Sequence, residues 1–226
     1  MSDSIIIKKK INNFNKVINV SGDKSLSIRW VLLSSLANGV SIAKNLLLSE
    51  DVFAAINAIK KLGIKTKFNK SKCKIYGKGV EGYQYKKNLT INAQNSGTLG
   101  RLILGLLINT PYPIKLIGDK SLSKRDFKRI ADPLTKFGAR FDLKNNKNLP
   151  LKIFGSKKLK PIRFTEKKGS AQIKSSIIFA GMRTNDKTII KAKKSRNHTE
   201  LMCKYLNLPL RVKVKKNYDE IIVNKV

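Results

Sequence analysis

The chain of 226 residues is poor in acidic residues, cysteine, histidine and tryptophan. Its two cysteines, Cys73 and Cys203, are far apart, and neither belongs to a CxxC pair. This spacing excludes a disulfide framework and the usual cysteine-based metal sites, so we expect no metal site. The single histidine, His198, lies in the segment SRNHTE. We interpret it as a hydrogen-bonding residue near a helix start rather than as a catalytic base.

The sequence also lacks a long apolar run. The first ten residues, MSDSIIIKKK, carry an apolar stretch that is too short for a secretory signal. No later stretch reaches the length needed to cross a membrane. We therefore expect a cytoplasmic protein that makes no membrane contact and works in a reducing compartment.

Charge is the most uneven property of the chain. Lysine and arginine total 48 against 14 aspartates and glutamates, which gives a net charge of +34. A nucleic acid, an anionic membrane and small anionic substrates would each suit such a surplus. However, the lysines are spread over the whole sequence, and isoleucine and asparagine are also abundant, as a genome-wide compositional bias would produce. The charge alone therefore favours no single partner.

The order of the predicted elements repeats three times. Each round contains a strand, a nearly apolar helix, a second strand, an amphipathic helix and two more strands. The apolar helices begin near Ser25, Ser96 and Ser170, about 71 and 74 residues apart. Because such helices must be buried, we predict an α/β (or α+β) fold. In it, three βαβαββ units pack with quasi-threefold symmetry around the buried helices.

The periodicity also gives the bounds of the expected elements. Helices are predicted from the segment 22–29 onward and at 49–62, 95–108, 123–137, 169–182 and 197–206. Strands are predicted at 5–7, 16–20, 65–68, 72–76, 89–93, 113–117, 140–143, 151–154, 187–191, 210–214 and 220–226. The three units would then span about 21–93, 94–160 and 161–226. For 197–206, the Asn-x-x-Glu start predicts a capping box.

Five of the predicted helix starts carry functional polar groups instead of ordinary caps. They are GDKSLSIR (22–29), NSGT (95–98), SLSKR (121–125), GSAQ (169–172) and SRNH (195–198). Free backbone N–H groups and the helix dipole favour an anion at such positions. If the units pack side by side, the starts converge on one face that carries Lys24, Arg29, Arg125 and Arg196. We interpret this face as a site for a small, multiply charged anion.

Taken in order and spacing, these motifs closely resemble the EPSP synthase (3-phosphoshikimate 1-carboxyvinyltransferase) family. The motifs are GDKSLSIR, NSGTLGRLILGLL, GDKSLSKRDFKRIADPLTKFGA, GSAQIKSSIIFAGM and SRNHTE, and they extend from Gly22 to Glu200. The resemblance implies a fold of two similar domains, each built from three βαβαββ units. By this comparison residues 21–226 match one domain, and residues 1–20 form a strand region that belongs with the second domain. The chain then looks like a half-length fragment that is inactive alone.

The resemblance also implies a reaction and a set of ligands. The family transfers the enolpyruvyl group of phosphoenolpyruvate to the 5-hydroxyl of shikimate 3-phosphate, without a cofactor, in the shikimate pathway. The positions that match shikimate 3-phosphate ligands are Lys24, Ser25, Arg29, Ser170, Ala171, Gln172 and Arg196. Those that match phosphoenolpyruvate ligands are Lys24, Asn95, Gly97, Arg125 and Gln172. The catalytic general base is expected in the second domain, and the full-length form is expected to be a monomer.

Several questions stay open at this point. A UDP-N-acetylglucosamine enolpyruvyl transferase would share the fold, although GDKSLSIR and GSAQ fit the shikimate enzyme better. A basic nucleic-acid-binding module would explain the charge, but the chain shows no aromatic-rich binding motif. Arg101 lies in an otherwise apolar helix, where we interpret it as a buried structural ion and not as a site residue. Sensitivity to glyphosate also stays open, since Gly97 and Ala171 resemble different branches of the family.

Overall fold

The computed structural model describes residues 6, 8–10, 13, 15–69 and 72–226, and it is a mixed α/β structure with three separate sheets. The first sheet has the strand order β1-β3-β2, and both of its pairings are antiparallel. Its elements are α1 (Lys24–Ser35), β1 (Asn38–Lys44), α2 (Glu50–Lys61), β2 (Lys65–Asn69) and β3 (Lys72–Lys78). The predicted strand at 5–7 falls largely outside the described residues.

The second and third sheets share one topology. Their orders are β4-β5-β7-β6 and β8-β9-β11-β10, and in each the first pair is parallel and the other two are antiparallel. The second unit contains β4 (Thr90–Asn92), α3 (Gly97–Leu106), β5 (Ile114–Ile117), α4 (Lys120–Ser123), α5 (Lys128–Thr135), β6 (Arg140–Lys144) and β7 (Asn148–Phe154). The third contains β8 (Arg163–Glu166), α6 (Ala171–Gly181), β9 (Thr188–Lys193), α7 (His198–Tyr205), β10 (Leu210–Val214) and β11 (Tyr218–Val223).

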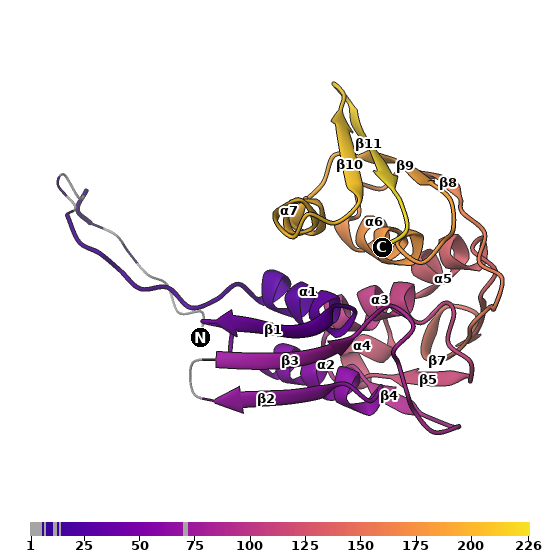
Figure 1. The fold of residues 1–226 in the computed structure, drawn as a ribbon. Helices are drawn as coiled ribbons and strands as arrows, with labels where there is room; N and C mark the ends of the chain where they lie inside the picture. Colours follow the sequence, from indigo (N-terminus) through magenta and orange to yellow (C-terminus); the bar gives the residue numbers. More distant parts are fainter. Residues whose placement is uncertain (1–5, 7, 11–12, 14, 70–71) are drawn as a thin grey trace.

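The first unit differs because its sheet has no parallel outer strand among the described residues. In the other units this strand ends five residues before the apolar helix begins, as Asn92 precedes Gly97. The matching segment, 16–20, was predicted to be a strand, but the structure shows none there, and Val17 is 97% exposed. An extended segment is a strand only when its backbone groups pair with a neighbour. In Figure 1 this segment belongs to an arm that extends away from the body.

Three helices, α1, α3 and α6, lie at the centre of the body with the sheets around them (Figure 1). Nine of the ten residues of α3 are buried, as its apolar sequence predicts. The closest approach is between α3 and α6, where a Cβ on Gly105 would lie only 2.2 Å from the backbone oxygen of Ser176. Glycine at this position therefore lets the two central helices touch through their backbones.

The predicted helices are confirmed, but the start predicted for the helix at 123–137 is wrong, because α5 spans only Lys128–Thr135. The chain forms the single-turn α4, leaves the helical path, and begins α5 at Lys128. The break occurs because the backbone N–H of Phe127 donates to the carbonyl of Lys147, which lies in the turn before β7. Lys124 and Arg125 consequently follow the end of α4 and do not begin a helix.

Two smaller expectations also need correction. The segment 89–93 was placed in the first unit, but β4 pairs with β5 and so belongs to the second sheet. The side chain of Asn197 makes no cap hydrogen bond among the described residues, because Glu200 pairs with Lys174 and no capping box forms.

By contrast, both copies of GDKSLS begin a helix in the same way: Asp23 and Asp119 each accept a hydrogen bond from the backbone three residues ahead.

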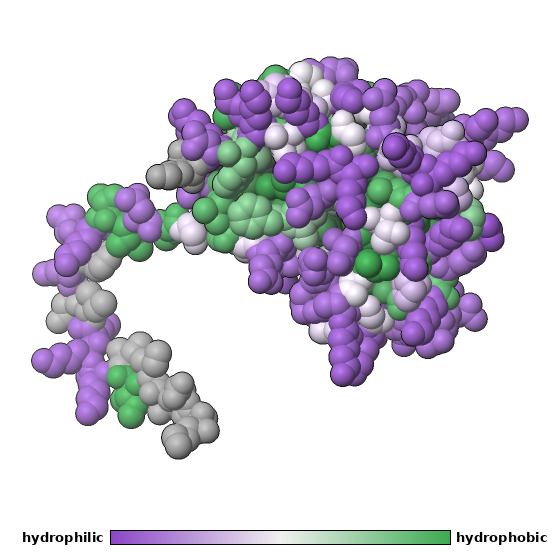
Figure 2. Space-filling view, turned by 90° about the horizontal axis from the view of Figure 1, so that it is seen from below, coloured by the Kyte–Doolittle hydropathy of each residue, from purple (hydrophilic) through white to green (hydrophobic). Residues whose placement is uncertain are grey.

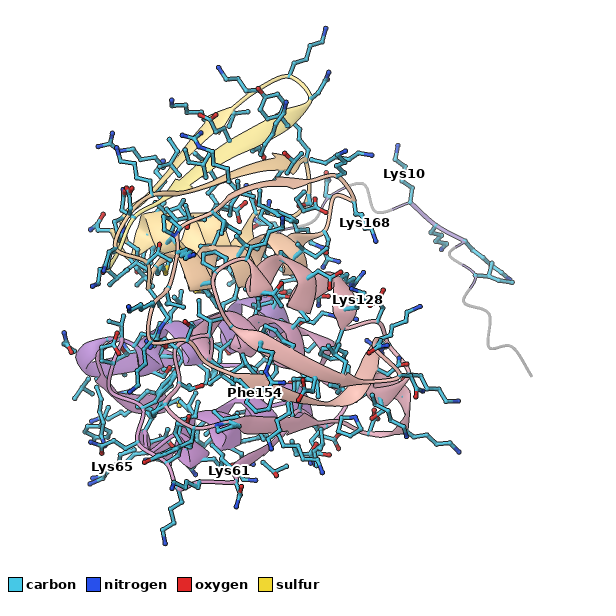
Figure 3. All side chains as sticks on the ribbon, turned by 90° about the vertical axis from the view of Figure 1, so that its right-hand side faces the viewer. Lys10, Lys61, Lys65, Lys128, Phe154 and Lys168 are labelled. Atoms are coloured by element: carbon cyan, nitrogen blue, oxygen red, sulfur yellow. The ribbon has the colours of Figure 1, made fainter. Side chains whose placement is uncertain are left out.

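Hydrophilic side chains cover most of the face that is seen in Figure 2. In the view of Figure 2 they surround a smaller apolar area near the root of the N-terminal arm. In Figure 3 labelled lysines project from the arm (Lys10), from the first unit (Lys61, Lys65) and from the other units (Lys128, Lys168). Lysines of the arm and of separate units therefore reach the surface. In the described part of the chain, no helix is both long and apolar enough to span a bilayer.

Candidate functional site

A pocket of about 570 Å³ lies where several of the motif segments meet. It receives residues from the starts of α1 and α6, from the segment that precedes α7, and single residues from α3 and α5. The lining residues are Lys24, Ser25, Arg29, Thr98, Arg129, Lys168, Gly169, Ser170, Ala171, Gln172, Ser195, Arg196 and His198. All seven residues predicted as shikimate 3-phosphate ligands are in this set.

The pocket is strongly cationic. Among its lining residues are five cationic side chains and no carboxylate: Lys24, Arg29, Arg129, Lys168 and Arg196. The N-termini of two long helices, α1 and α6, add the positive ends of their dipoles. Charges of one sign in a concave site raise the local concentration of oppositely charged ligands. The pocket is therefore suited to a small polyanion.

Lys24 is the first residue of α1, and the cap of Asp23 fixes where that helix begins. The Asp23 carboxylate accepts from the backbone N–H of Leu26 at 2.7 Å. In this structure the Lys24 ammonium lies 2.8 Å from a carboxylate oxygen of Asp51, at the start of α2. The Lys24 side chain is half exposed, so it can turn from Asp51 toward a ligand at little cost.

Arg29 forms one wall of the pocket, although it is only 4% exposed. Its guanidinium donates to Oγ1 of Thr199 at 2.7 Å, to Oγ of Ser175 at 3.2 Å and to the carbonyl of Ser25 at 3.0 Å. Burial lowers the pKa of Arg29, and the nearby Glu200 carboxylate opposes that shift. Three of its five N–H groups have partners, so the side chain is held rigidly. The other two N–H groups can still donate to a ligand.

The loop before α6 is organised by a buried carboxylate. Glu166, 3% exposed, accepts hydrogen bonds from the backbone N–H groups of Lys168, Gly169 and Ser170 at 2.8, 2.8 and 3.1 Å. The hydroxyl of Ser170 caps α6 by accepting from the backbone of Ile173. These backbone donors are already used, so the loop must contact a ligand chiefly through its side chains.

Three of the predicted phosphoenolpyruvate residues lie beside the pocket and not in its lining. The amide of Asn95 donates to Asp119 at 2.6 Å and so joins the loop before α3 to the loop before α4. A Cβ on Gly97 would lie 3.1 Å from a terminal nitrogen of Arg125 and 3.3 Å from one of Arg101. Two guanidinium groups therefore converge over Gly97, next to Thr98 of the pocket lining.

Six lining residues were missed or assigned no binding role from the sequence: Thr98, Arg129, Lys168, Gly169, Ser195 and His198. Lys168 could have been found, since it lies two residues before the capping Ser170. No comparable sequence pattern marks Arg129, because its position in the pocket depends on the break in the chain before α5. His198 is the first residue of α7 and lines the pocket, so its position is closer to the site than the sequence suggested.

Other hollows in the described structure do not gather the motif residues. One of them, about 820 Å³, lies on the outer face of the first sheet and is lined by Ile42, Phe68, Asn69 and four lysines. A second, about 470 Å³, is mostly apolar and lies between α1, β1 and α7. Among the described residues, histidine, cysteine and carboxylate side chains form no cluster of three that could hold a metal ion. The cationic pocket is therefore the candidate site.

The repeated βαβαββ topology and a cationic pocket at the helix starts define a class: mixed α/β repeat proteins with an anion-binding type of site. A family model described as EPSP synthase (3-phosphoshikimate 1-carboxyvinyltransferase) matches residues 8–224. The chain therefore belongs to the EPSP synthase family, as its motifs indicated. Sequence and structure comparisons agree on this assignment.

Among its relatives, a 3-phosphoshikimate 1-carboxyvinyltransferase of Caldicellulosiruptor bescii is 44% identical over 200 residues, which cover 88% of this chain and 45% of the relative. One of Streptococcus agalactiae is 41% identical over 206 residues, covering 90% and 48%. The solved EPSP synthase of Acinetobacter baumannii superimposes with a TM-score of 0.84 at 31% identity, covering 92% of this chain and 46% of that one. The chain thus spans about half the length of the curated relatives it matches.

Proposed function

We propose that this chain forms the shikimate 3-phosphate-binding half of a 3-phosphoshikimate 1-carboxyvinyltransferase. The observation that carries the proposal is the pocket, in which separate repeats contribute five cations and no carboxylate. Shikimate 3-phosphate is a small ring that bears a phosphate and a carboxylate, so it offers an anionic group to more than one of these cations. Arginine suits this task because its planar fork can bind two oxygens of one anion.

In the whole protein, the reaction is an addition followed by an elimination. The 5-hydroxyl oxygen of shikimate 3-phosphate attacks C2 of phosphoenolpyruvate, its proton leaves, and C3 takes up a proton. The tetrahedral intermediate then loses inorganic phosphate from C2 and a proton from C3, which restores the double bond. Fixed cations lower the cost of bringing two anionic substrates together and hold them in a reactive orientation.

We base the proposed ligand roles on the family motifs that these residues match. Seven lining residues bind shikimate 3-phosphate: Lys24, Ser25, Arg29, Ser170, Ala171, Gln172 and Arg196. Phosphoenolpyruvate lies toward Gly97, within reach of Lys24, Asn95, Arg125 and Gln172. We place the general base in the half of the family's proteins that this chain does not span, as the family resemblance implies.

The direct test is isothermal titration of the folded chain with shikimate 3-phosphate. Arg196 is exposed, so Arg196→Ala should keep the fold while weakening binding at least tenfold, because a hydrogen bond to a charged group contributes about 1.5–3 kcal/mol. Arg211→Ala is a matched control, since it removes an equally exposed arginine from β10, outside the pocket. Absence of binding by the wild-type chain, or equal losses in the two variants, contradicts the proposal.

Two of the alternatives left open by the sequence make different predictions. A nucleic-acid-binding module would bind RNA or DNA with an affinity that falls steeply with salt. We propose instead that the even spread of lysines gives only weak, sequence-independent binding, which filter binding at two salt concentrations would test. A UDP-N-acetylglucosamine transferase would prefer the nucleotide sugar, and the same titration with that ligand separates the two enzymes.

We further propose that the N-terminal arm belongs with the second domain of the family's fold, and that activity requires this domain. Val17, Ile18 and Val20 are 97%, 66% and 71% exposed, which is unusual for three apolar residues in one short segment. Replacing Val17 and Ile18 by aspartate should leave the stability of the 226-residue chain unchanged. The chain alone should release no phosphate from the two substrates, so measurable phosphate release contradicts this part.

A further inference from the structure

Arg101 is buried in α3, yet it lies next to the cationic pocket. It is 6% exposed, and its guanidinium lies over the ring of Phe127 at 5.5 Å from the ring centre. Burial, followed by the charges of Arg129 and Arg125, lowers its pKa to about 10, so it stays charged at neutral pH. Its Nε is buried without a hydrogen-bond partner among the described residues. A charged guanidinium in such buried surroundings requires a functional explanation.

The one side-chain acceptor that the structure gives Arg101 is Gln172. A terminal nitrogen of Arg101 donates to Oε1 of Gln172 at 2.5 Å. The amide nitrogen of Gln172 lies on the other side, 3.4 Å from Oγ1 of Thr98, and both residues line the pocket. A glutamine amide can adopt two flipped orientations that differ only in which end is the donor. Here the flipped form would place an NH2 group against a guanidinium, donor against donor.

We infer that Arg101 is a positioning residue: by holding Oε1 of Gln172, it forces the NH2 group of that amide to face the ligand. Gln172 has two amide hydrogens, and Thr98 can take only one of them, so one donor is left for the pocket. The site would therefore select a ligand atom that accepts a hydrogen bond, such as a phosphate, carboxylate or hydroxyl oxygen. The ligand side of this inference rests on the proposed function, whereas the amide orientation does not.

Arg183 shows what a purely structural arginine looks like in the same chain. It is 7% exposed, its guanidinium lies 5.9 Å from the ring centre of Tyr83, and it donates to the carbonyl of Val80. Burial lowers its pKa as well. The two arginines thus share burial, an aromatic neighbour and an oxygen acceptor. They differ in that the acceptor of Arg101 lines the pocket. Arg183 is therefore the matched control.

The orientation can be tested without any ligand. The chain has three glutamines, Gln84, Gln94 and Gln172, so glutamine labelled with ¹⁵N in its side chain gives three NH2 pairs in an NMR spectrum. Gln172→Ala identifies the relevant pair. In Arg101→Met this pair should move, and its exchange with solvent should speed up at least tenfold. In Arg101→Lys the shift should be smaller, because the ammonium can still donate to Oε1.

Arg183→Met should leave the Gln172 pair unchanged. An unchanged Gln172 pair in a folded Arg101 variant overturns the inference, and so does an equal change in Arg183→Met. If Arg101→Met does not fold, Arg101→Lys decides by the same signal.

A titration with shikimate 3-phosphate then tests the consequence for binding. Arg101→Met and Gln172→Ala should each weaken binding about tenfold, and the double variant should be no weaker than the single ones. Non-additivity of this kind shows that Arg101 acts through Gln172. Fully additive losses overturn that step. A wild-type chain that binds no shikimate 3-phosphate contradicts the proposed function, while the amide signals still decide the role of Arg101.

Discussion

Lys174 and Glu200 form an ion pair in the protein interior, with Nζ of Lys174 only 2.6 Å from Oε1 of Glu200. The two side chains are 0% and 6% exposed, and they join α6 to α7. The pair lies directly behind the pocket wall, because Ser175 and Thr199, the sequence neighbours of these residues, both accept from Arg29. One buried contact thus aligns two of the helices that form the site.

Removing one member of this pair should destabilise the chain strongly. Lys174→Met leaves the Glu200 carboxylate buried and unpaired, which costs about 3–5 kcal/mol. Urea unfolding measures the loss. The double variant Lys174→Met, Glu200→Leu removes both charges, so it should recover most of the stability. A double variant as unstable as the single one would show that packing, and not the unpaired charge, sets the cost.

The contact between α3 and α6 should not tolerate a side chain at Gly105. Gly105→Ala would place a Cβ 2.2 Å from the backbone oxygen of Ser176, which cannot move aside as a side chain can. Overpacking of this kind costs about 1–3 kcal/mol, even after the better helix propensity of alanine is counted. Gly100→Ala is the control in the same helix, because its nearest neighbour is the ring of Phe127 at 3.3 Å. Thermal unfolding should rank Gly105→Ala well below Gly100→Ala.

The sequence predicted those features that depend on local signals. The helix starts expected near Ser96 and Ser170 are confirmed, and both serines also cap their helices, because a serine hydroxyl at a helix start satisfies a free backbone donor. The three-round repeat was visible for the same reason, since period and composition are properties of each segment. These signals were enough to indicate both the fold class and most residues of the pocket.

The features that could not be predicted from the sequence depend on contacts between residues that are far apart in the chain. The break before α5 requires Phe127 to bond to Lys147, and no local pattern encodes that contact. The segment 16–20 has the composition of a strand, but a strand also requires a neighbour to pair with. Arg101 was interpreted as structural because its helix is apolar. Its contact with Gln172, 71 residues away, appears only when α3 and α6 pack together.

The hydroxyl of Thr199 should matter for ligand binding although it lies behind the pocket. Thr199→Val keeps the shape of the side chain but removes the acceptor that holds Nε of Arg29 at 2.7 Å. A lost hydrogen bond of this kind is worth about 1 kcal/mol, so the affinity for shikimate 3-phosphate should fall about fivefold. Thr184→Val is the control, because that buried hydroxyl donates to the carbonyl of Gly181, away from the pocket. Equal effects of the two variants would contradict the prediction.

Asp51 should compete with the ligand for Lys24. Asp51→Asn removes the carboxylate that now lies 2.8 Å from the Lys24 ammonium, so the ammonium is free to turn toward the pocket. Because an exposed pair is worth up to about 1 kcal/mol, titration should show a gain in affinity of up to about fivefold. Glu50→Gln removes the same charge from the same turn of α2 without touching this pair. An equal gain in Glu50→Gln would mean that net charge, and not the release of Lys24, causes the effect.

Cys203 should make the stability of the chain depend on pH above pH 9. Burial, and then the charge of Glu200, raises the pKa of this thiol from 9.0 to about 12. Between these values the unfolded chain releases the thiol proton while the folded chain keeps it. The folded state then binds more protons, so the free energy of unfolding falls as the pH rises, by about 1.4 kcal/mol per pH unit.

Cys203→Ala removes this titration while leaving every other basic and acidic group in place. Urea unfolding of both chains at pH 8.5, 9.5 and 10.5 separates the thiol from the many lysines, whose titration is common to the two proteins. The wild-type curve should fall more steeply than that of Cys203→Ala above pH 9, and the two should run parallel below it. The alanine variant will be less stable at every pH because of the lost packing, so the difference in slope is the informative quantity. Parallel curves over the whole range would mean that the Cys203 thiol titrates as in the unfolded chain, which its full burial between Arg29 and Glu200 argues against.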